Sequence, residues 1–184
     1  PLLPQTEKHY QRVLLVDTSA SMRRENLWPE ALKKSETTLR ASKPADDLAV
    51  MTFGREVRTL IGFEEWRNAS VESRQGLAQG RLNSSRPGWS ATSLGKALLA
   101  AVELLQEQIT KTDEAINRQI VVVSDLQQGS RLDGLQGFEW PKGIEVVFES
   151  VAPADPSNAS VQWLAETSAS FGKEIRPRVR VRNS

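Results

Sequence analysis

The stretch Asp17-Thr-Ser-Ala-Ser21 places oxygen-bearing side chains directly after the apolar run Val13–Val16. An acid and two serines at alternate positions on a tight strand-to-helix turn can aim three oxygens at one point. Hard cations such as Mg²⁺ prefer about six oxygen ligands and keep water where the protein supplies none. The stretch indicates a cation site, but the same residue types cap helices, and the turn alone leaves both interpretations open.

Two distant segments supply side chains of the same kind. Thr92 precedes the most amphipathic stretch of the chain, and we expect its hydroxyl to point out of a loop rather than into the core. Asp125 ends the apolar segment 120–125, where a buried strand would not carry an acid unless something compensated its charge. We therefore expect two carboxylates and three hydroxyls to converge on one ion.

The segments between these residues alternate between strand and helix patterns. Apolar runs at 13–16, 48–53, 120–125 and 144–151 are typical of strands covered on both faces. Leu and Ala recur at spacings of three and four from residue 93 to 109, which predicts a helix with one apolar face. A second helix is predicted over 26–41, and a weaker one over 71–82. The inward residues of the helix at 26–41 are predicted to be Leu27, Ala31, Leu32 and Leu39.

The order of these elements predicts an α/β fold with a doubly wound, Rossmann-like and mostly parallel sheet, with helices on both faces. A hairpin at Gly54 supplies one antiparallel edge strand, and Val57, Thr59 and Ile61 are predicted to share one face of it. Ligands of such sheets bind beyond the carboxyl ends of the strands, where both acids stand.

The segments "DTSASM", "SATSLGKAL" and "VVVSDL" resemble, in matching order, the three pieces of the metal-ion-dependent adhesion site (MIDAS) of the von Willebrand factor type A (VWA) family. The resemblance covers roughly residues 11–151. It implies that Ser19, Ser21 and Thr92 are hydroxyl ligands of a metal and that Asp17 and Asp125 act directly or through water. Leu126 and Gln127 follow the second acid where a glycine is commoner in the family, which leaves the shape of that loop open.

Such a site implies a bound divalent cation, Mg²⁺ first and Mn²⁺ or Ca²⁺ as alternatives, with one coordination position open. An acidic residue of a protein partner is expected to fill that position. The chain is therefore expected to be a binding domain rather than an enzyme, because neither serine has a histidine to activate it.

The edge around the metal contains basic and aromatic residues. Arg23, Arg24, Arg86 and Arg131 are predicted to lie in loops or first turns, where they either steer an acidic partner or form ordinary solvated charge. Trp89 is either an exposed anchor for a partner or a core residue. The other tryptophans are expected to pack structurally: Trp28, Trp66, Trp140 and Trp163.

Two rival functions come from other classes. A strand-terminal acid followed by hydroxyls is also found in haloacid dehalogenase-like phosphatases, but that chemistry needs a second acid where Ser19 stands. The third possibility is a VWA fold that binds no metal and serves as an assembly scaffold.

Composition excludes several classes of protein. The 184 residues include 39% hydrophobic and 26% charged residues, which is typical of a folded globular domain. A net charge of +1 gives no global attraction to nucleic acid, and we expect no nucleic-acid partner. The absence of cysteine excludes disulfides and thiolate sites, and a single histidine disfavours multi-histidine metal sites.

The organisation of the chain is predicted to be a VWA domain at 8–152 followed by a linker and the start of a truncated β-sandwich at 153–184. Residues 175–182 alternate apolar residues with arginines, as in a half-buried strand, and the segment 160–170 is expected to pair with them. A basic strand for an acidic partner or a lipid surface is the alternative. The motifs also resemble, more loosely, bacterial membrane-anchored VWA proteins of the aerotolerance (Bat-like) type. The chain is thus expected to be the soluble domain of a longer membrane protein, with its cellular location undetermined.

Overall fold

The computed structural model describes residues 9–109, 116–126 and 135–152, together with the backbone of two strands at 159–164 and 178–183. The chain divides into two compact units, Pro1–Pro153 and Ala154–Ser184. The first unit contains the sheet, its helices and all the residues predicted to bind metal.

The first unit is built on a five-stranded sheet with the order β3-β2-β1-β4-β5. The neighbours β1–β2, β1–β4 and β4–β5 are parallel, and only β3 runs antiparallel, against β2. The α/β, mostly parallel fold with one antiparallel edge strand is therefore confirmed. The strand bounds are β1 His9–Asp17, β2 Asp47–Phe53, β3 Val57–Ile61, β4 Ile116–Ser124 and β5 Ile144–Ser150.

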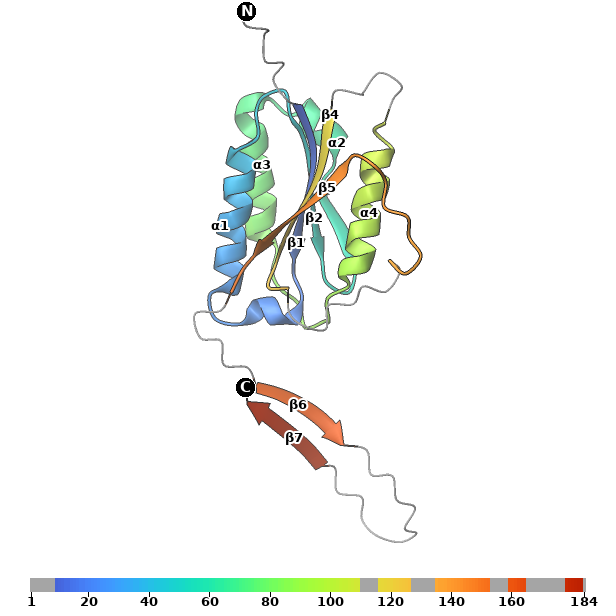
Figure 1. Cartoon of the computed structure of the whole chain (residues 1–184). Coiled ribbons are helices and arrows are strands. Elements are labelled where there is room, and N and C mark those ends of the chain that lie inside the picture. Colours follow the sequence, from blue (N-terminus) through green and yellow to red (C-terminus); the bar gives the residue numbers. More distant parts are fainter. Residues whose placement is uncertain (1–8, 110–115, 127–134, 153–158, 165–177, 184) are drawn as a thin grey trace, which may run out of the picture. The chain divides into compact units, whose positions relative to one another are not determined.

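Helices cover both faces of this sheet. Figure 1 shows α1 and α3 side by side on one face and α4 on the other. The bounds are η1 Ala20–Arg23, α1 Leu27–Arg40, α2 Phe63–Asn68, α3 Val71–Ser84 and α4 Leu94–Gln106. Among the helices that the structure describes, none has both the length and the apolar character needed to cross a bilayer.

The alternation of β1 explains why its apolar run is continuous. Leu14 and Val16 face the core under α1 and α3, whereas Val13 and Leu15 face the core under α4, and all four are fully buried. Burying one Val or Leu side chain stabilises a fold by about 1.5–3 kcal/mol, so a strand that is apolar on both faces must lie at the centre of a covered sheet. The position of Asp17 at its end is fixed by this burial.

The prediction for the face of β3 was wrong. Val50 pairs with Ile61 but Met51 pairs with Thr59, so Leu60 is the extra residue of a β-bulge. A bulge reverses the alternation of side chains beyond it. Ile61 consequently packs in the core under α1 and α3, Val57 packs on the opposite core, and Thr59 is exposed.

The tryptophans differ in their surroundings. Trp66, in the unpredicted helix α2, is buried and donates a hydrogen bond of 3.1 Å from Nε1 to the main-chain oxygen of Asp46. Trp28 is buried as predicted. The prediction for Trp140 was only partly right: it is 36% exposed and packs at the surface, edge-on to Phe138. The side chain of Trp163 lies outside the described residues.

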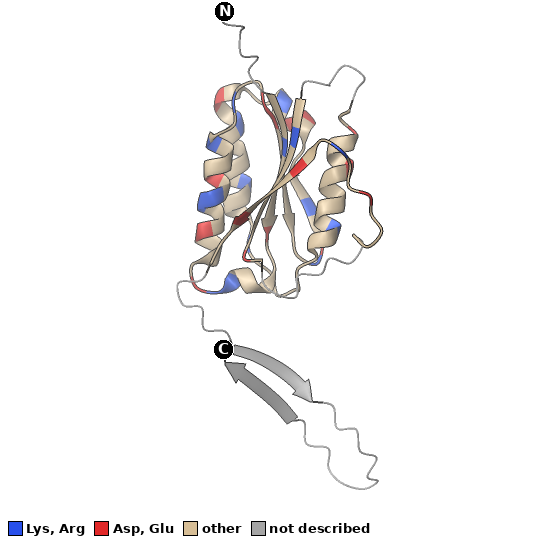
Figure 2. Cartoon of the chain, in the orientation of Figure 1, with Lys and Arg blue, Asp and Glu red and all other residues tan. Residues whose placement is uncertain are grey.

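The second unit contains one antiparallel pair, β6 (Ala159–Leu164) with β7 (Arg178–Asn183). The predicted pairing of these two segments is confirmed, whereas their membership of a β-sandwich stays a prediction. Charged residues of opposite sign interleave along α1 in the first unit (Figure 2).

Candidate metal centre

The two predicted acids lie at the same edge of the sheet. Asp17 is the last residue of β1, and Asp125 directly follows the neighbouring parallel strand β4. Val16 pairs with Val123, so the ends of the two strands are level. The Asp125 carboxylate is among the neighbours that raise the pKa of Asp17.

Asp17 is fully buried and is held by two hydrogen bonds. Its Oδ2 accepts the hydroxyl of Ser124 at 2.6 Å, and its Oδ1 accepts the main-chain N–H of Ser19 at 2.8 Å. Burial raises the pKa of Asp17, the two hydrogen bonds lower it, and the nearby Asp125 carboxylate raises it, with burial the largest effect. Within the described part of the chain, no ion pair includes either acid.

The turn after β1 brings its two serines together. The hydroxyl oxygens of Ser19 and Ser21 lie 3.1 Å apart, and either can donate to the other. Thr18 between Asp17 and Ser19 is fixed to β2, because both its N–H and its hydroxyl donate to the main-chain oxygen of Phe53. Asp17, Ser19 and Ser21 therefore share one compact turn, and their joint binding of a metal stays a prediction.

The loop before α4 is bonded to this turn along its length. Gly88 N–H donates to Thr18 O at 2.8 Å, and Ala20 N–H donates to Ser90 O at 2.9 Å. Ser93 N–H then donates to the main-chain oxygen of Gly54 at 3.1 Å. Thr92, between these anchors, is consequently held at the same edge as the serines.

Two polar atoms at this edge are buried without a protein partner. Within the described residues, neither the hydroxyl of Thr92 nor Oδ2 of Asp125 forms a hydrogen bond. Burying such a group without a partner costs about 1–3 kcal/mol, and more when it is charged. A cation bonded to both atoms would remove that cost, so the donor set present fits a hard, oxygen-preferring divalent ion.

The chemistry of this set depends on hydroxyls. Across residues 9–109, 116–126 and 135–152, no three His, Cys, Asp or Glu side chains lie together as a metal cage. Two carboxylates and three hydroxyls provide oxygen donors of the class that Mg²⁺, Mn²⁺ and Ca²⁺ prefer.

The rim residues have distinct environments. Trp89 is 82% exposed, which decides between the two interpretations of this residue in favour of the surface. The Arg23 guanidinium stacks on its ring, 3.8 Å from the centroid, and donates to Pro87 O at 3.1 Å. Arg24 is half-buried, and Arg86 is exposed and donates to the main-chain oxygens of Asn83 and Ser85. Arg131 lies outside the described residues.

Sequence reasoning missed Ser124 and the backbone of Leu126. Ser124 was counted only as part of a strand, yet its hydroxyl donates to Asp17 and accepts the N–H of Leu126 at 3.1 Å. Leu126 has a φ of 47°, in the left-handed region that glycine favours. The departure from glycine noted at this position was the available signal, because a leucine there must adopt a conformation that costs energy.

Comparison with known proteins gives a family and a set of similar folds. The sequence model of the von Willebrand factor type A domain matches residues 12–129. A comparison with curated protein sequences finds no match.

Solved structures of three proteins illustrate the likeness. An aerotolerance-related membrane protein from Bacteroides fragilis is 19% identical, with a TM-score of 0.60 over 94% of this chain and 81% of that chain. BatB from Bacteroides thetaiotaomicron is 16% identical, with a TM-score of 0.58 over 94% and 80%. Proximal thread matrix protein 1 from the mussel byssus is 16% identical, with a TM-score of 0.54 over 77% and 35%, in a structure whose MIDAS motif is occupied by zinc.

The share of each relative that is matched differs widely. The chain spans about a third of the mussel protein and only 20% of a type V pilus tip protein fragment from Porphyromonas gingivalis. At these identities the likeness establishes the fold.

Proposed function

Because the chain belongs to the von Willebrand factor type A domain family, we propose that it is a protein-binding domain whose binding depends on a divalent cation. The ion is Mg²⁺ first among the candidates, with Mn²⁺ and Ca²⁺ as alternatives, and it binds an acidic residue of a partner protein. The observation that carries the proposal is the pair of buried, unpartnered oxygens at one sheet edge, Thr92 Oγ1 and Asp125 Oδ2, among the described residues.

The residues that would hold the ion are the five predicted from the sequence: Asp17, Ser19, Ser21, Thr92 and Asp125. When bound, the ion supplies an electrophilic position that a carboxylate oxygen can occupy. The protein's own contribution is a fixed set of oxygen donors with a small total charge. Three of the five donors are neutral, so less of the ion's charge is compensated than in a carboxylate cage, and a further anionic ligand is favoured.

Binding is favoured over catalysis by the position of the single histidine. His9 begins β1, whereas Asp17 ends it, so the imidazole lies at the opposite edge of the sheet from the hydroxyls. Ser19 and Ser21 thus have no histidine base beside them, and a serine without a base is a weak nucleophile.

The Arg23–Trp89 pair supports a protein partner. Trp89 is exposed, and both the stacked guanidinium and the bonded loop hold it in place. Large aromatic and arginine side chains carry most of the energy at protein interfaces, and a fixed side chain loses little entropy on binding. An acidic residue at the metal with an apolar neighbour on Trp89 would use both features.

The parent protein is proposed to be of the membrane-anchored, Bat-like kind. The two Bacteroides structures support this extension, because each of them matches 94% of this chain.

Calorimetry tests the metal. Wild type is titrated with Mg²⁺ and Mn²⁺ beside Thr92→Val, which keeps the shape of the side chain but removes its hydroxyl, and Thr92→Ser, which keeps the hydroxyl. We expect Thr92→Val to lose at least about tenfold in affinity and Thr92→Ser to retain most of it. Equal affinity of all three proteins would contradict the site, and no binding at all would favour the metal-free scaffold.

Water-proton relaxation tests the open position. Mn²⁺ bound by wild type is expected to enhance relaxation through its remaining water ligands. A short peptide with one glutamate should lower that enhancement, and the same peptide with glutamine should not. A signal that neither peptide changes would count against carboxylate binding at the ion. Phosphatase turnover by wild type that disappears in Asp17→Asn would instead favour the haloacid dehalogenase-like phosphatase.

A further inference from the structure

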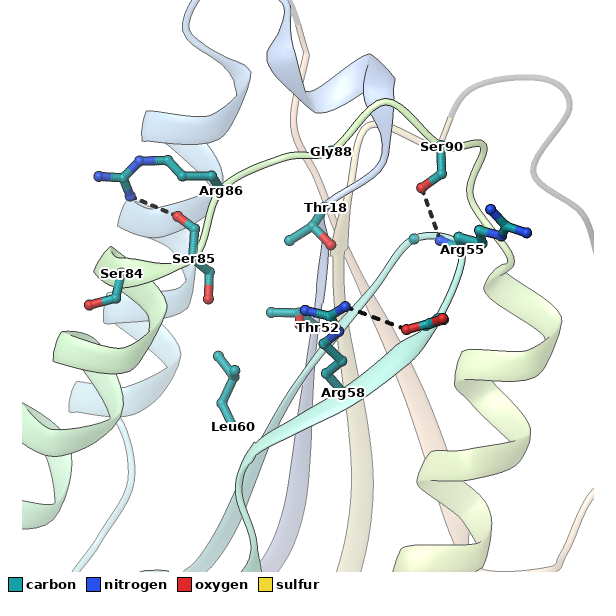
Figure 3. Close-up of a pocket in the computed structure, with 12 residues that line it drawn as sticks. Thr18, Thr52, Arg55, Arg58, Leu60, Ser84, Ser85, Arg86, Gly88 and Ser90 are labelled. Carbon is teal, nitrogen blue, oxygen red and sulfur yellow. Dashed lines mark hydrogen bonds and ion pairs between the residues drawn. The ribbon is translucent and has the colours of Figure 1, made fainter.

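A cavity of about 490 Å³ lies beside the proposed metal site, in the first unit. The end of β1, the β2–β3 hairpin, the end of α3 and the loop after it form its walls (Figure 3). Its lining is rich in hydroxyls and arginines, including Thr18, Thr52, Ser85, Arg55, Arg58 and Arg86.

The cavity shares a wall with the proposed metal site. Thr18 lines the cavity and stands between Asp17 and Ser19 in sequence. Ser90 also lines it, and while its main-chain oxygen accepts Ala20 N–H from the metal-site turn, its hydroxyl accepts Arg55 N–H at 3.1 Å. The cavity and the proposed metal site are therefore connected through the backbone of Thr18 and Ser90.

The charge of the lining favours an anion. The lining contains three arginines and one acid, Glu56, which pairs with Arg58 at 3.4 Å. The two side chains of that pair are 74% and 69% exposed, and an ion pair so open to water contributes little to stability. A carboxylate from outside can replace Glu56 at small cost, so Glu56 occupies the position that a ligand would take.

The arginines are spread along the cavity rather than clustered. In Figure 3, Arg58 extends along the middle of the cavity beside Thr52, whereas the side chains of Arg86 and Arg55 extend outward from its two ends. The bonds from Arg86 to main-chain oxygens hold its guanidinium in place. Because a guanidinium has five N–H donors, some of these donors remain for a ligand. This spacing suits several carboxylates on an extended segment better than one compact anion.

We propose that this cavity is a second subsite for the partner, which takes the side-chain carboxylates of an acidic peptide segment. The inference rests on the proposed function for the first contact, in which one acid binds the metal. It adds that the partner's recognition segment carries further acidic residues beside that one, and that Arg58 is a main determinant of their binding.

The test uses a fluorescein-labelled hexaglutamate peptide and its hexaglutamine counterpart, with binding followed by anisotropy in 150 mM salt. Wild type is compared with Arg58→Gln and with Arg40→Gln, a matched control on α1 whose side chain is equally exposed at 74% and is also paired with a glutamate. We expect Arg58→Gln to weaken hexaglutamate binding about tenfold and Arg40→Gln to leave it nearly unchanged.

Binding measured with and without the metal separates this inference from the proposed function. In EDTA, or in Thr92→Val with Mg²⁺, binding should weaken but should still depend on Arg58. If the metal has no effect while Arg58→Gln still weakens binding, the proposed function fails and the subsite stands. Equal effects of Arg58→Gln and Arg40→Gln would overturn the subsite, because they would reduce it to net charge. Tight binding of hexaglutamine, or binding of inorganic phosphate without binding of hexaglutamate, would overturn it as well.

Discussion

The residue at the end of β1 carries a charge that its protein neighbours do not balance. Asp17 receives hydrogen bonds from Ser124 and Ser19, but no cation from the described residues pairs with it. Hydrogen bonds stabilise a buried carboxylate only in part, and a second carboxylate nearby works against it. The hydroxyl of Ser124 is therefore important to the fold as well as to the site.

We predict that Ser124→Ala lowers the free energy of unfolding by about 1.5–3 kcal/mol at neutral pH, because a buried carboxylate loses a hydrogen-bond donor. Denaturant unfolding without metal measures this. Without that donor the pKa of Asp17 rises further, so the deficit should shrink as the pH falls and Asp17 is protonated.

Ser35→Ala is the matched control for this variant. Ser35 is also fully buried, but its hydroxyl donates to Ala31 O within α1, where no charge depends on it. We expect a smaller loss that does not change with pH. A pH-independent loss in Ser124→Ala would show that the serine acts through packing alone.

Leu126 gives a second prediction at this scale. Its φ of 47° costs a leucine roughly 1–2 kcal/mol, a cost that a glycine does not have, and the residue is 37% exposed. Leu77→Gly on α3, at a similar exposure of 36%, loses similar burial and should lower the free energy of unfolding by about 1 kcal/mol or more. Leu126→Gly should lower it by about 1–2 kcal/mol less than Leu77→Gly does, because it also removes the backbone strain. Equal losses in both would show that the backbone at Leu126 is not strained.

Residue types at strand ends were enough to predict where Asp17 and Asp125 lie, because burial of an apolar run fixes which residue emerges at the sheet edge. The exposure of Trp89 was not predictable in the same way. It depends on Arg23, distant in sequence, stacking on the ring from the turn after β1. Contacts of that kind between loops have no periodic pattern that a single sequence reveals.

At the scale of elements, long periodic segments were predicted and short ones were not. The helix predicted over 71–82 is α3, and the one predicted over 93–109 is α4, each with shifted ends. Helix α2 was missed because six residues are too few to show a helical period, and the bulge at Leu60 was missed because one added residue changes no composition. Tertiary contacts decide both features.

Trp66 is the residue through which α2 is held. It is buried, and its indole N–H donates to Asp46 O in the turn before β2. Trp66→Ala should lower the free energy of unfolding by about 3–5 kcal/mol through the cavity it leaves, and Trp66→Phe should lower it less, through a smaller cavity and one unpaired oxygen. Thermal unfolding of both variants checks this. A loss under about 1 kcal/mol in Trp66→Ala would mean that α2 contributes little to the fold.

For the whole molecule, metal binding and folding are linked. An ion that binds only the folded protein stabilises it by about 2.7 kcal/mol at a hundred times its dissociation constant. For a domain of this size that corresponds to a rise in Tm of roughly 5–10 °C. Wild type should show this rise in Mg²⁺ and Thr92→Val at the same concentration should not. A rise shared by both proteins would mean that the ion binds elsewhere.

The pH dependence of stability provides the last prediction, and its sign follows from Asp17. The pKa of this carboxyl is raised above its ordinary value of 3.8 by burial, so ionised Asp17 destabilises the metal-free fold. That cost is fully present above the raised pKa and disappears as the pH falls below 3.8. Asp17→Asn carries no such charge, and its stability relative to metal-free wild type should therefore increase as the pH rises from about 4 to 7.

Added Mg²⁺ should reverse that order, because the ion compensates the charge of Asp17 in wild type and finds one carboxylate fewer in the variant. Above the raised pKa, wild type with Mg²⁺ should then become the more stable of the two proteins, and below pH 4 the ion should have no effect on either. Urea unfolding at several pH values, with Mg²⁺ or with EDTA, measures all four curves. A metal-free wild type that gains stability relative to Asp17→Asn as the pH rises would mean that a protein group already balances this charge, and the strongest physical reason for an ion at this edge would be lost.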